Sequence, residues 1–97
     1  MSAVRTFQTT PRYERAYKRY VGRDRKRRGC IAGTLATLLE NPWHPSLGTH
    51  RLKGSLEGAL SCSCGYDCRI LFTIEPSPRP HAGLIVLHDV GTHDEVY

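Results

Sequence analysis

Residues 84–97 read LIVLHDVGTHDEVY, an apolar run that passes directly into a polar one. The apolar part, residues 84–88, has the composition of a buried β-strand. Gly91 permits a sharp turn after it, and the spacing of Thr92 and Glu95 is that of a capping box, which begins a helix. We therefore expect a strand followed by a single helical turn, with the remaining chain built around the junction between them.

The predicted helical turn carries two side chains with useful chemistry, His93 and Tyr97. Both are expected at the end of a sheet, beside a helix N-terminus, which favours negative charge. Histidine is the side chain whose ordinary pKa lies nearest neutrality. A histidine, a phenol and free backbone N–H groups in this setting suit reactions at a phosphate, so this end of the sheet is the candidate functional site.

Several other segments have the alternating or apolar pattern of strands. The strongest is 67–75, in which Asp67 and Arg69 fall on the face opposite to the apolar one. Residues 76–80 are too rich in proline for a sheet and predict a hairpin loop. The core-facing residues expected in two of the strands are Leu60, Cys62, Cys64, Ile70, Phe72 and Ile74. The expected strands cover residues 3–7, 50–53, 57–64, 67–75 and 82–90.

Two helices are expected in the first half of the chain. Thr10 has N-cap character and precedes Pro11, which suits the first helical position, and Gly22 ends this helix. Asp24 caps the second helix, which ends at residues 41–42 because a residue before proline resists helical backbone angles. Apolar residues at helical spacing predict the buried stripes, which are Tyr13, Ala16, Tyr17, Tyr20 and Val21 in the first helix and Ile31, Leu35, Leu38 and Leu39 in the second.

Helices early in the chain and hairpin-connected strands late in it predict one α+β domain over residues 1–97. We expect the two N-terminal helices to pack on one face of a twisted, mainly antiparallel sheet of four to five strands. Trp43, in the loop 42–48, is expected to pack against the helices. The uncovered face would carry the polar residues near the strand ends, which are His50, Asp67, Arg69, His93 and Tyr97.

The formal net charge is +5, and the positive charge is concentrated near the start of the chain. Residues 5–28 hold ten of the fourteen Lys and Arg residues but only two acidic ones, Glu14 and Asp24. Such a concentration indicates a polyanion such as nucleic acid, or an acidic protein, as the partner. The other interpretation is a solvated helix face, and the charge pattern alone leaves both open.

No segment is long and apolar enough to cross a membrane, and the first residues lack the apolar stretch of a secretory signal, so a cytoplasmic protein is expected. A disulfide framework is therefore not expected from the four cysteines. Cys62, Cys64 and Cys68 have an irregular spacing for zinc, so we predict core cysteines rather than metal ligands. The sequence predicts no cofactor and no metal site.

Three blocks of the chain match a known pattern. They are NP at residues 41–42 followed by HRLKG at 50–54, DCRILF at 67–72, and GTHDEVY at 91–97. On these blocks the chain resembles the RelE/ParE superfamily of bacterial type II toxins, in particular the RelE-like mRNA interferases. The helical first half agrees with this family in layout, so the resemblance covers essentially the whole chain.

The resemblance implies a RelE-like fold and a toxin that a cognate antitoxin neutralises, in a toxin–antitoxin hetero-oligomer. It implies a ribosome-dependent endoribonuclease that cleaves mRNA in the ribosomal A site without a metal ion. In this reaction a ribose 2′-OH attacks the adjacent phosphate. The chemistry requires a base for the 2′-OH, a cation for the phosphate and an acid for the leaving oxygen.

The resemblance also assigns roles to residues of this chain. His93 would be general acid or base, with Asp67 or His50 as its partner. Arg69 would stabilise the charge on the phosphate, and Tyr97 would orient the substrate or stack on a base. Contacts to the RNA backbone and to ribosomal RNA would come from Arg51, Lys53, Arg25, Lys26, Arg27 and Arg28.

Other interpretations stay open at the level of sequence. Asp67 could simply cap the turn after Gly65, and Arg69 could pair with Glu57 or Glu75. A toxin of the ParE branch, which inhibits DNA gyrase, is the alternative function, although the Gly-Thr-His block argues against it. A catalytically weak module that binds antitoxin and nucleic acid is a further alternative.

Overall fold

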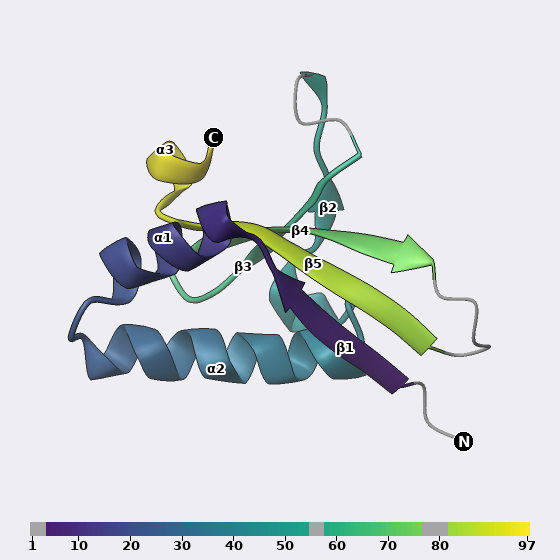
Figure 1. Cartoon of the computed structure of the whole chain (residues 1–97), viewed down its shortest axis with the longest axis horizontal. Helices are drawn as coiled ribbons and strands as arrows, with labels where there is room; N and C mark the ends of the chain where they lie inside the picture. The colour runs from purple at the N-terminus through teal and green to yellow at the C-terminus, as the bar shows by residue number, and fades with distance from the viewer. Residues whose placement is uncertain (1–3, 55–57, 77–81) are drawn as a thin grey trace.

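The structure is a computed structural model, and it describes residues 4–54, 58–76 and 82–97. It confirms the α+β class, with helices first and hairpin-connected strands after them (Figure 1). The elements in chain order are β1 (Val4–Thr9), α1 (Pro11–Val21), α2 (Arg25–Glu40), the 3₁₀ turn η1 (Pro45–Leu47), β2 (His50–Arg51), β3 (Leu60–Ser63), β4 (Arg69–Pro76), β5 (Ala82–Gly91) and α3 (His93–Val96).

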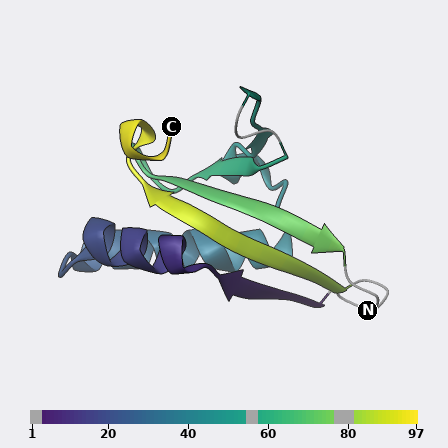
Figure 2. The ribbon, with the colours of Figure 1, turned by 45° about the horizontal axis from the view of Figure 1, so that its top comes forward.

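The strands form one five-stranded sheet in the order β1-β5-β4-β3-β2. Only β1 and β5 run parallel, and the other neighbours are antiparallel, so the prediction of a mainly antiparallel sheet is confirmed. Helices α1 and α2 lie on one face of this sheet, whereas α3 lies on the other (Figure 2). In the ranges that the structure describes, α3 is the one helix on this second face, which we call the open face. Strand β2 is shorter than the predicted 50–53, and β1 extends beyond the predicted 3–7.

Both long helices begin with the predicted caps. The Thr10 side chain accepts a hydrogen bond from the backbone N–H of Tyr13, and the Asp24 carboxylate accepts bonds from Lys26 and Arg27. These bonds satisfy N–H groups that have no partner within the helix. Gly22 ends α1 with a positive φ of 51°, a conformation that glycine adopts without steric cost.

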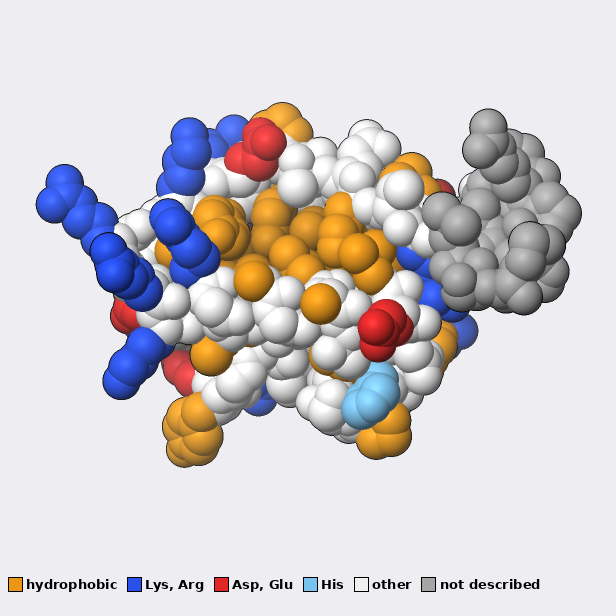
Figure 3. All heavy atoms as spheres, turned by 90° about the horizontal axis from the view of Figure 1, so that it is seen from below, with side chains coloured by type: hydrophobic (Ala, Val, Ile, Leu, Met, Phe, Trp, Pro, Cys, Tyr) orange, Lys and Arg blue, Asp and Glu red, His pale blue; other side chains and the backbone are white. Residues whose placement is uncertain are grey.

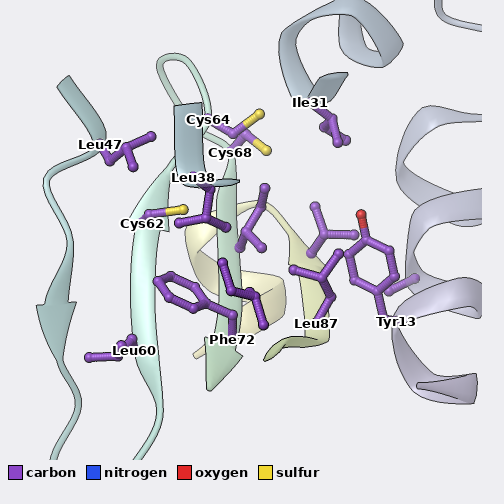
Figure 4. Packing of buried hydrophobic residues seen from close by; sticks show 14 of the residues in the cluster. Tyr13, Ile31, Leu38, Leu47, Leu60, Cys62, Cys64, Cys68, Phe72 and Leu87 are labelled. Atoms are coloured by element: carbon purple, nitrogen blue, oxygen red, sulfur yellow. The ribbon is translucent and has the colours of Figure 1, made fainter. Parts of the chain in front are cut away.

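The core lies between the two long helices and the covered face of the sheet (Figure 4). The predicted helical stripes are confirmed, because Tyr13, Ala16, Val21, Ile31 and Leu38 are all buried. Among the strand residues, the largest fully buried side chains are Phe72, Ile70, Ile85, Leu87 and Val90. Cys62, Cys64 and Cys68 are also buried, as predicted, whereas Cys30 on α2 is exposed.

Strands β4 and β5 pair with one irregularity. Leu71 pairs with Asp89 but Phe72 pairs with Leu87, so His88 is the extra residue of a β-bulge. Ile74, predicted to face the core, is 38% exposed. Ile74 shares the face of Phe72, as predicted, but it lies near the end of β4 and is not part of the buried core. Of the predicted hairpin loop, residues 77–80 lie outside the described residues.

Trp43, which was expected to pack against the helices, is only half-buried. It is 49% exposed, and the guanidinium of Arg51 lies 5.8 Å from the centre of its ring. An arginine over an indole face is a favourable cation–π arrangement. None of the helices in the described part of the chain has the length and apolar character that crossing a membrane requires.

Candidate active site

A row of paired residues crosses the open face of the sheet. His50 of β2 pairs with Ser61 of β3, Ser61 pairs with Leu71 of β4, and Leu71 pairs with Asp89 of β5. Directly paired residues project to the same face of an antiparallel sheet. The four residues therefore share the face on which α3 lies, and the predicted site residue His50 stands at one end of the row.

Arg69 lies in the neighbouring row on the same face. It pairs with Ser63 on one side and with Gly91 on the other, two residues before His93. Its guanidinium donates a hydrogen bond of 2.9 Å to the backbone carbonyl of Cys68. Among the described residues Arg69 has no ion pair, so its remaining donors are available to a ligand.

The alternative pairing of Arg69 with Glu75 is wrong. The carboxylate of Glu75 accepts a hydrogen bond of 3.3 Å from Thr73 instead. The other candidate partner, Glu57, lies outside the described residues.

The predicted capping box at the start of α3 is confirmed. The Thr92 hydroxyl accepts a bond of 3.3 Å from the Glu95 N–H, and the Glu95 carboxylate accepts one of 2.9 Å from the Thr92 N–H. The backbone and side-chain bonds from Thr92 lower the pKa of Glu95. A side chain at Gly91 would place its Cβ 3.1 Å from the Glu95 carboxylate, so Glu95 would have to shift to accommodate it.

The capping box fixes His93 beside two of the other predicted residues. The backbone N–H of His93 donates a bond of 3.4 Å to the Asp67 carboxylate, which comes from the hairpin between β3 and β4. The imidazole ring meets the Tyr97 ring edge-on, with 4.6 Å between their centres. Its Nδ1 lies 3.6 Å from the Asp94 carboxylate, and more than half of the side chain is exposed. Asp67 thus contacts α3 rather than acting only as a turn cap.

Tyr97 connects α3 to the row below it. Its hydroxyl is hydrogen-bonded to the side chain of Ser61, which is fully buried. Ser61 is also the partner of His50 across β2 and β3. The structure therefore brings His93, Tyr97 and Asp67 into contact, and strand pairing puts Arg69 and His50 on the same open face.

Replacing Tyr97 with phenylalanine is expected to destabilise the fold by about 1–3 kcal/mol, because the buried Ser61 hydroxyl would lose its partner. Urea denaturation followed by circular dichroism measures this. Tyr66→Phe is the matched control, since Tyr66 is fully exposed and should give the midpoint of the unaltered chain. Identical midpoints for the two variants would mean that the Tyr97–Ser61 bond contributes nothing to stability.

The sequence interpretation missed two buried polar residues on this face, Ser61 and Asp89. Asp89 is 4% exposed, accepts a bond of 2.9 Å from the backbone of Val90 and pairs with Arg12 at 3.0 Å. The sequence contains one signal of this, which is an aspartate inside an apolar strand. A carboxylate is rarely buried without a partner, so this position indicates a buried ion pair. Through Arg12, this bond ties α1 to the edge of the open face.

The sequence did not predict the β-bulge at His88. The bulge in β5 brings it to the side chain of Thr73, to which its Nε2 is hydrogen-bonded at 2.9 Å.

The basic start of α2 lies close to Asp67. Lys26 and Arg27 line a pocket of about 240 Å³ together with Asp67 and the β3–β4 hairpin. Arg27 also stacks over the Tyr20 ring at 4.3 Å. Arg25 and Arg28 are exposed. Lys and Arg side chains gather at this end of the helical side (Figure 3), which is the end at which α2 begins.

The two remaining basic residues, Arg51 and Lys53, lie at the opposite border of the open face. Both line a shallow depression with Leu52, Gly54 and Gly58. Arg51 belongs to β2, next to His50. The open face thus has lysine or arginine near both of its borders.

No protein-family model matches the sequence, and no curated protein is significantly similar to it. Solved structures do match. YafQ from E. coli strain BL21(DE3) has a TM-score of 0.74 at 15% identity, covering 96% of this chain and 98% of its own. The YoeB/ParE toxin from Agrobacterium tumefaciens has a TM-score of 0.75 at 15% identity, covering 91% and 98%.

YafQ in the E. coli DinJ–YafQ toxin–antitoxin complex has a TM-score of 0.67 at 21% identity, covering 96% of this chain and 97% of its own. At these identities the likeness concerns the fold. The chain therefore has the fold of these YafQ and YoeB structures, which agrees with the fold that the resemblance of its three sequence blocks implies.

Proposed function

We propose that this protein is the toxin of a type II toxin–antitoxin system and a ribosome-dependent endoribonuclease that cleaves mRNA in the A site. One observation carries the proposal: α3 holds His93 and Tyr97 in ring contact, with Asp67 bound to the same helix, over an open sheet face that also bears Arg69. This is the set of groups that cleavage of a phosphodiester by its own 2′-OH requires.

In the proposed reaction the 2′-oxygen attacks the adjacent phosphorus, and the bond to the 5′-oxygen of the next nucleotide breaks. The products are a 2′,3′-cyclic phosphate and a 5′-hydroxyl. A base removes the proton of the 2′-OH, and an acid supplies one to the leaving 5′-oxygen. The proton is therefore conserved over the step, and no water is consumed in it.

His93 is the proton-transferring group of this proposal, because its ring is exposed and lies next to Tyr97. Asp67 or His50 serves as the second group. Arg69 stabilises the negative charge that grows on the phosphate, and its fork of N–H donors suits two phosphate oxygens. Tyr97 positions the substrate. Its hydroxyl is hydrogen-bonded to Ser61, so its ring is a fixed surface on which a nucleobase can stack.

Binding of the RNA backbone is assigned to the basic residues at the two borders of the open face. Lys26 and Arg27 line the pocket beside Asp67, and Arg51 and Lys53 lie on the β2 side. These contacts are sequence-independent and weaken as salt increases. The exposed Arg25 and Arg28 extend the same positive surface toward ribosomal RNA.

The antitoxin is the proposed protein partner. The helical side of the molecule shows an apolar area next to the end at which Lys and Arg gather (Figure 3). The partly buried Phe7, Tyr17 and Leu35 are among the residues packed against the core. Exposed apolar area of this kind is typical of protein interfaces. The DinJ–YafQ complex shows that a protein with this fold forms a toxin–antitoxin complex.

The proposed function is tested in a reconstituted translation system with a defined mRNA and purified protein. We expect new 5′-hydroxyl ends within codons, and only when ribosomes translate the message. The same mRNA without ribosomes is the control. Growth arrest on expression together with intact transcripts would overturn the nuclease, and a supercoiling assay with purified gyrase would then test the ParE-like alternative.

A further inference from the structure

Two cysteines that the proposed reaction does not use face each other at the base of the β3–β4 hairpin. The backbone N–H of Cys64 donates a bond of 2.8 Å to the carbonyl of Cys68, which continues the pairing of Ser63 with Arg69. Both side chains are buried on the core side. Their sulfur atoms lie next to each other (Figure 4).

This geometry is compatible with a disulfide. Opposite residues of an antiparallel pair have Cα atoms about 4.5–5.5 Å apart, and disulfides span Cα separations of about 4.4–6.8 Å. The backbone bond between Cys64 and Cys68 marks a hydrogen-bonded pair, for which the usual Cα separation of about 5.5 Å lies within the range that disulfides span. In the structure both cysteines are free thiols.

The surroundings distinguish Cys64 from the other buried thiols. The neighbouring Cys68 thiol and, to a smaller extent, Thr34 of α2 lower the pKa of Cys64 below its ordinary value. Burial raises the pKa of Cys62 to about 12. The thiolate is the reactive form in exchange reactions, so Cys64 is the expected nucleophile and Cys62 is the internal comparison.

The pair is almost fully buried, with Cys64 2% and Cys68 3% exposed, but it lies at the wall of a pocket. Cys64 and Cys68 line the pocket of about 240 Å³ whose wall includes Lys26 and Arg27. Two cations beside a nucleophilic sulfur favour an approaching carboxylate-bearing disulfide. The exposed Cys30 lines the same pocket and is removed in the test below.

We propose that Cys64 and Cys68 form a redox-active pair that closes to a disulfide by exchange with a small anionic disulfide, such as oxidised glutathione. The Cys64 thiolate attacks one sulfur of oxidised glutathione, which forms a mixed disulfide and releases one glutathione thiolate. Cys68 loses its proton and attacks the Cys64 sulfur, which releases the second. Two protein thiols are oxidised, one oxidised glutathione becomes two reduced molecules, and the protons of the two cysteines pass to the released thiolates.

The hairpin that the disulfide would close carries two residues of the proposed active site. Asp67 lies between the cysteines and contacts His93, and the Arg69 guanidinium is bonded to the backbone of Cys68. The disulfide is expected to lower RNA cleavage by restricting this hairpin, and this consequence rests on the proposed function. Formation of the disulfide does not.

The test uses the full-length Cys30→Ser chain, incubated at pH 7 in glutathione buffers from fully reduced to fully oxidised, then alkylated and weighed by mass spectrometry. We expect the loss of two alkylatable thiols, a peptide that links Cys64 to Cys68, and a free Cys62. Cys68→Ser in the same background should instead retain glutathione on Cys64, because the resolving thiol is absent. The proposal of a redox-active pair is overturned if three free thiols remain in every buffer, or if Cys62 is modified in preference to Cys64.

RNA cleavage by the oxidised and re-reduced chain, in the translation assay, is the second readout. A lower rate that a reductant restores supports coupling between the pair and the site, and an equal rate in both states overturns the coupling. A chain that forms the disulfide but cleaves no RNA in either state overturns the proposed nuclease and leaves the redox pair established.

Discussion

Replacing His93 with glutamine is expected to lower the rate of mRNA cleavage by about 10²–10⁴-fold, the usual contribution of a positioned general acid or base. Glutamine approximates the size of the imidazole, but it cannot exchange a proton near neutral pH. The contact between Asp67 and α3 is made by the backbone N–H of residue 93, so the substitution leaves it in place. The loss should therefore be one of chemistry rather than of structure.

The measurement is the rate at which 5′-hydroxyl ends appear in translated mRNA at saturating protein, with the unfolding midpoint recorded for the same samples. His44→Asn is the matched control. His44 is an exposed histidine at η1 whose ring accepts a bond of 3.1 Å from the Ser46 N–H, a role that asparagine can fill. The control is expected to cleave at the rate of the unaltered chain.

A His93→Gln protein that keeps its fold and cleaves within about threefold of the normal rate would remove His93 from the proton transfers, since general acid–base catalysis contributes far more. His50 and Asp67 would then be the remaining candidates. A slower rate with a reduced unfolding midpoint would instead indicate that the ring contact with Tyr97 supports α3.

The parts of the site that were predictable from sequence are those set by local rules. The capping box of Thr92 and Glu95 depends on residues three apart, so the helical turn that carries His93 and Tyr97 could be predicted. The opposite faces of Arg69 and Ile70 follow from the two-residue period of a strand. The fold class follows from the order of these local elements.

The parts that were not predictable depend on residues far apart in the chain. Ser61 has no distinctive neighbour in sequence, and only the fold brings it to Tyr97, thirty-six residues later. Asp89 forms an ion pair with Arg12, which lies seventy-seven residues earlier in the chain. Local patterns cannot supply such pairs, because the first depends on Tyr97 meeting β3 after α3 and the second on α1 packing against β5.

The largest expected loss of stability comes from truncating Phe72 to alanine, with a cost of about 3–5 kcal/mol. Phe72 is fully buried on the covered face of the sheet, where it pairs with Leu87 and joins the cluster that contains Leu38 of α2. Its removal leaves a cavity that rigidly packed neighbours fill only in part. A domain of this size has a total stability of about 5–15 kcal/mol, so the variant is expected near the limit of folding.

Ile74→Ala is the matched control, because Ile74 lies on the same strand and on the same side, two residues farther along. It is 38% exposed, so its truncation should cost less than about 1 kcal/mol, as is usual for surface positions. Urea unfolding measures both variants, and Phe72→Leu provides a milder change if the alanine variant does not fold. The prediction depends on the different burial of the two side chains, 0% exposed for Phe72 and 38% for Ile74. Equal losses of stability in the two alanine variants would contradict it.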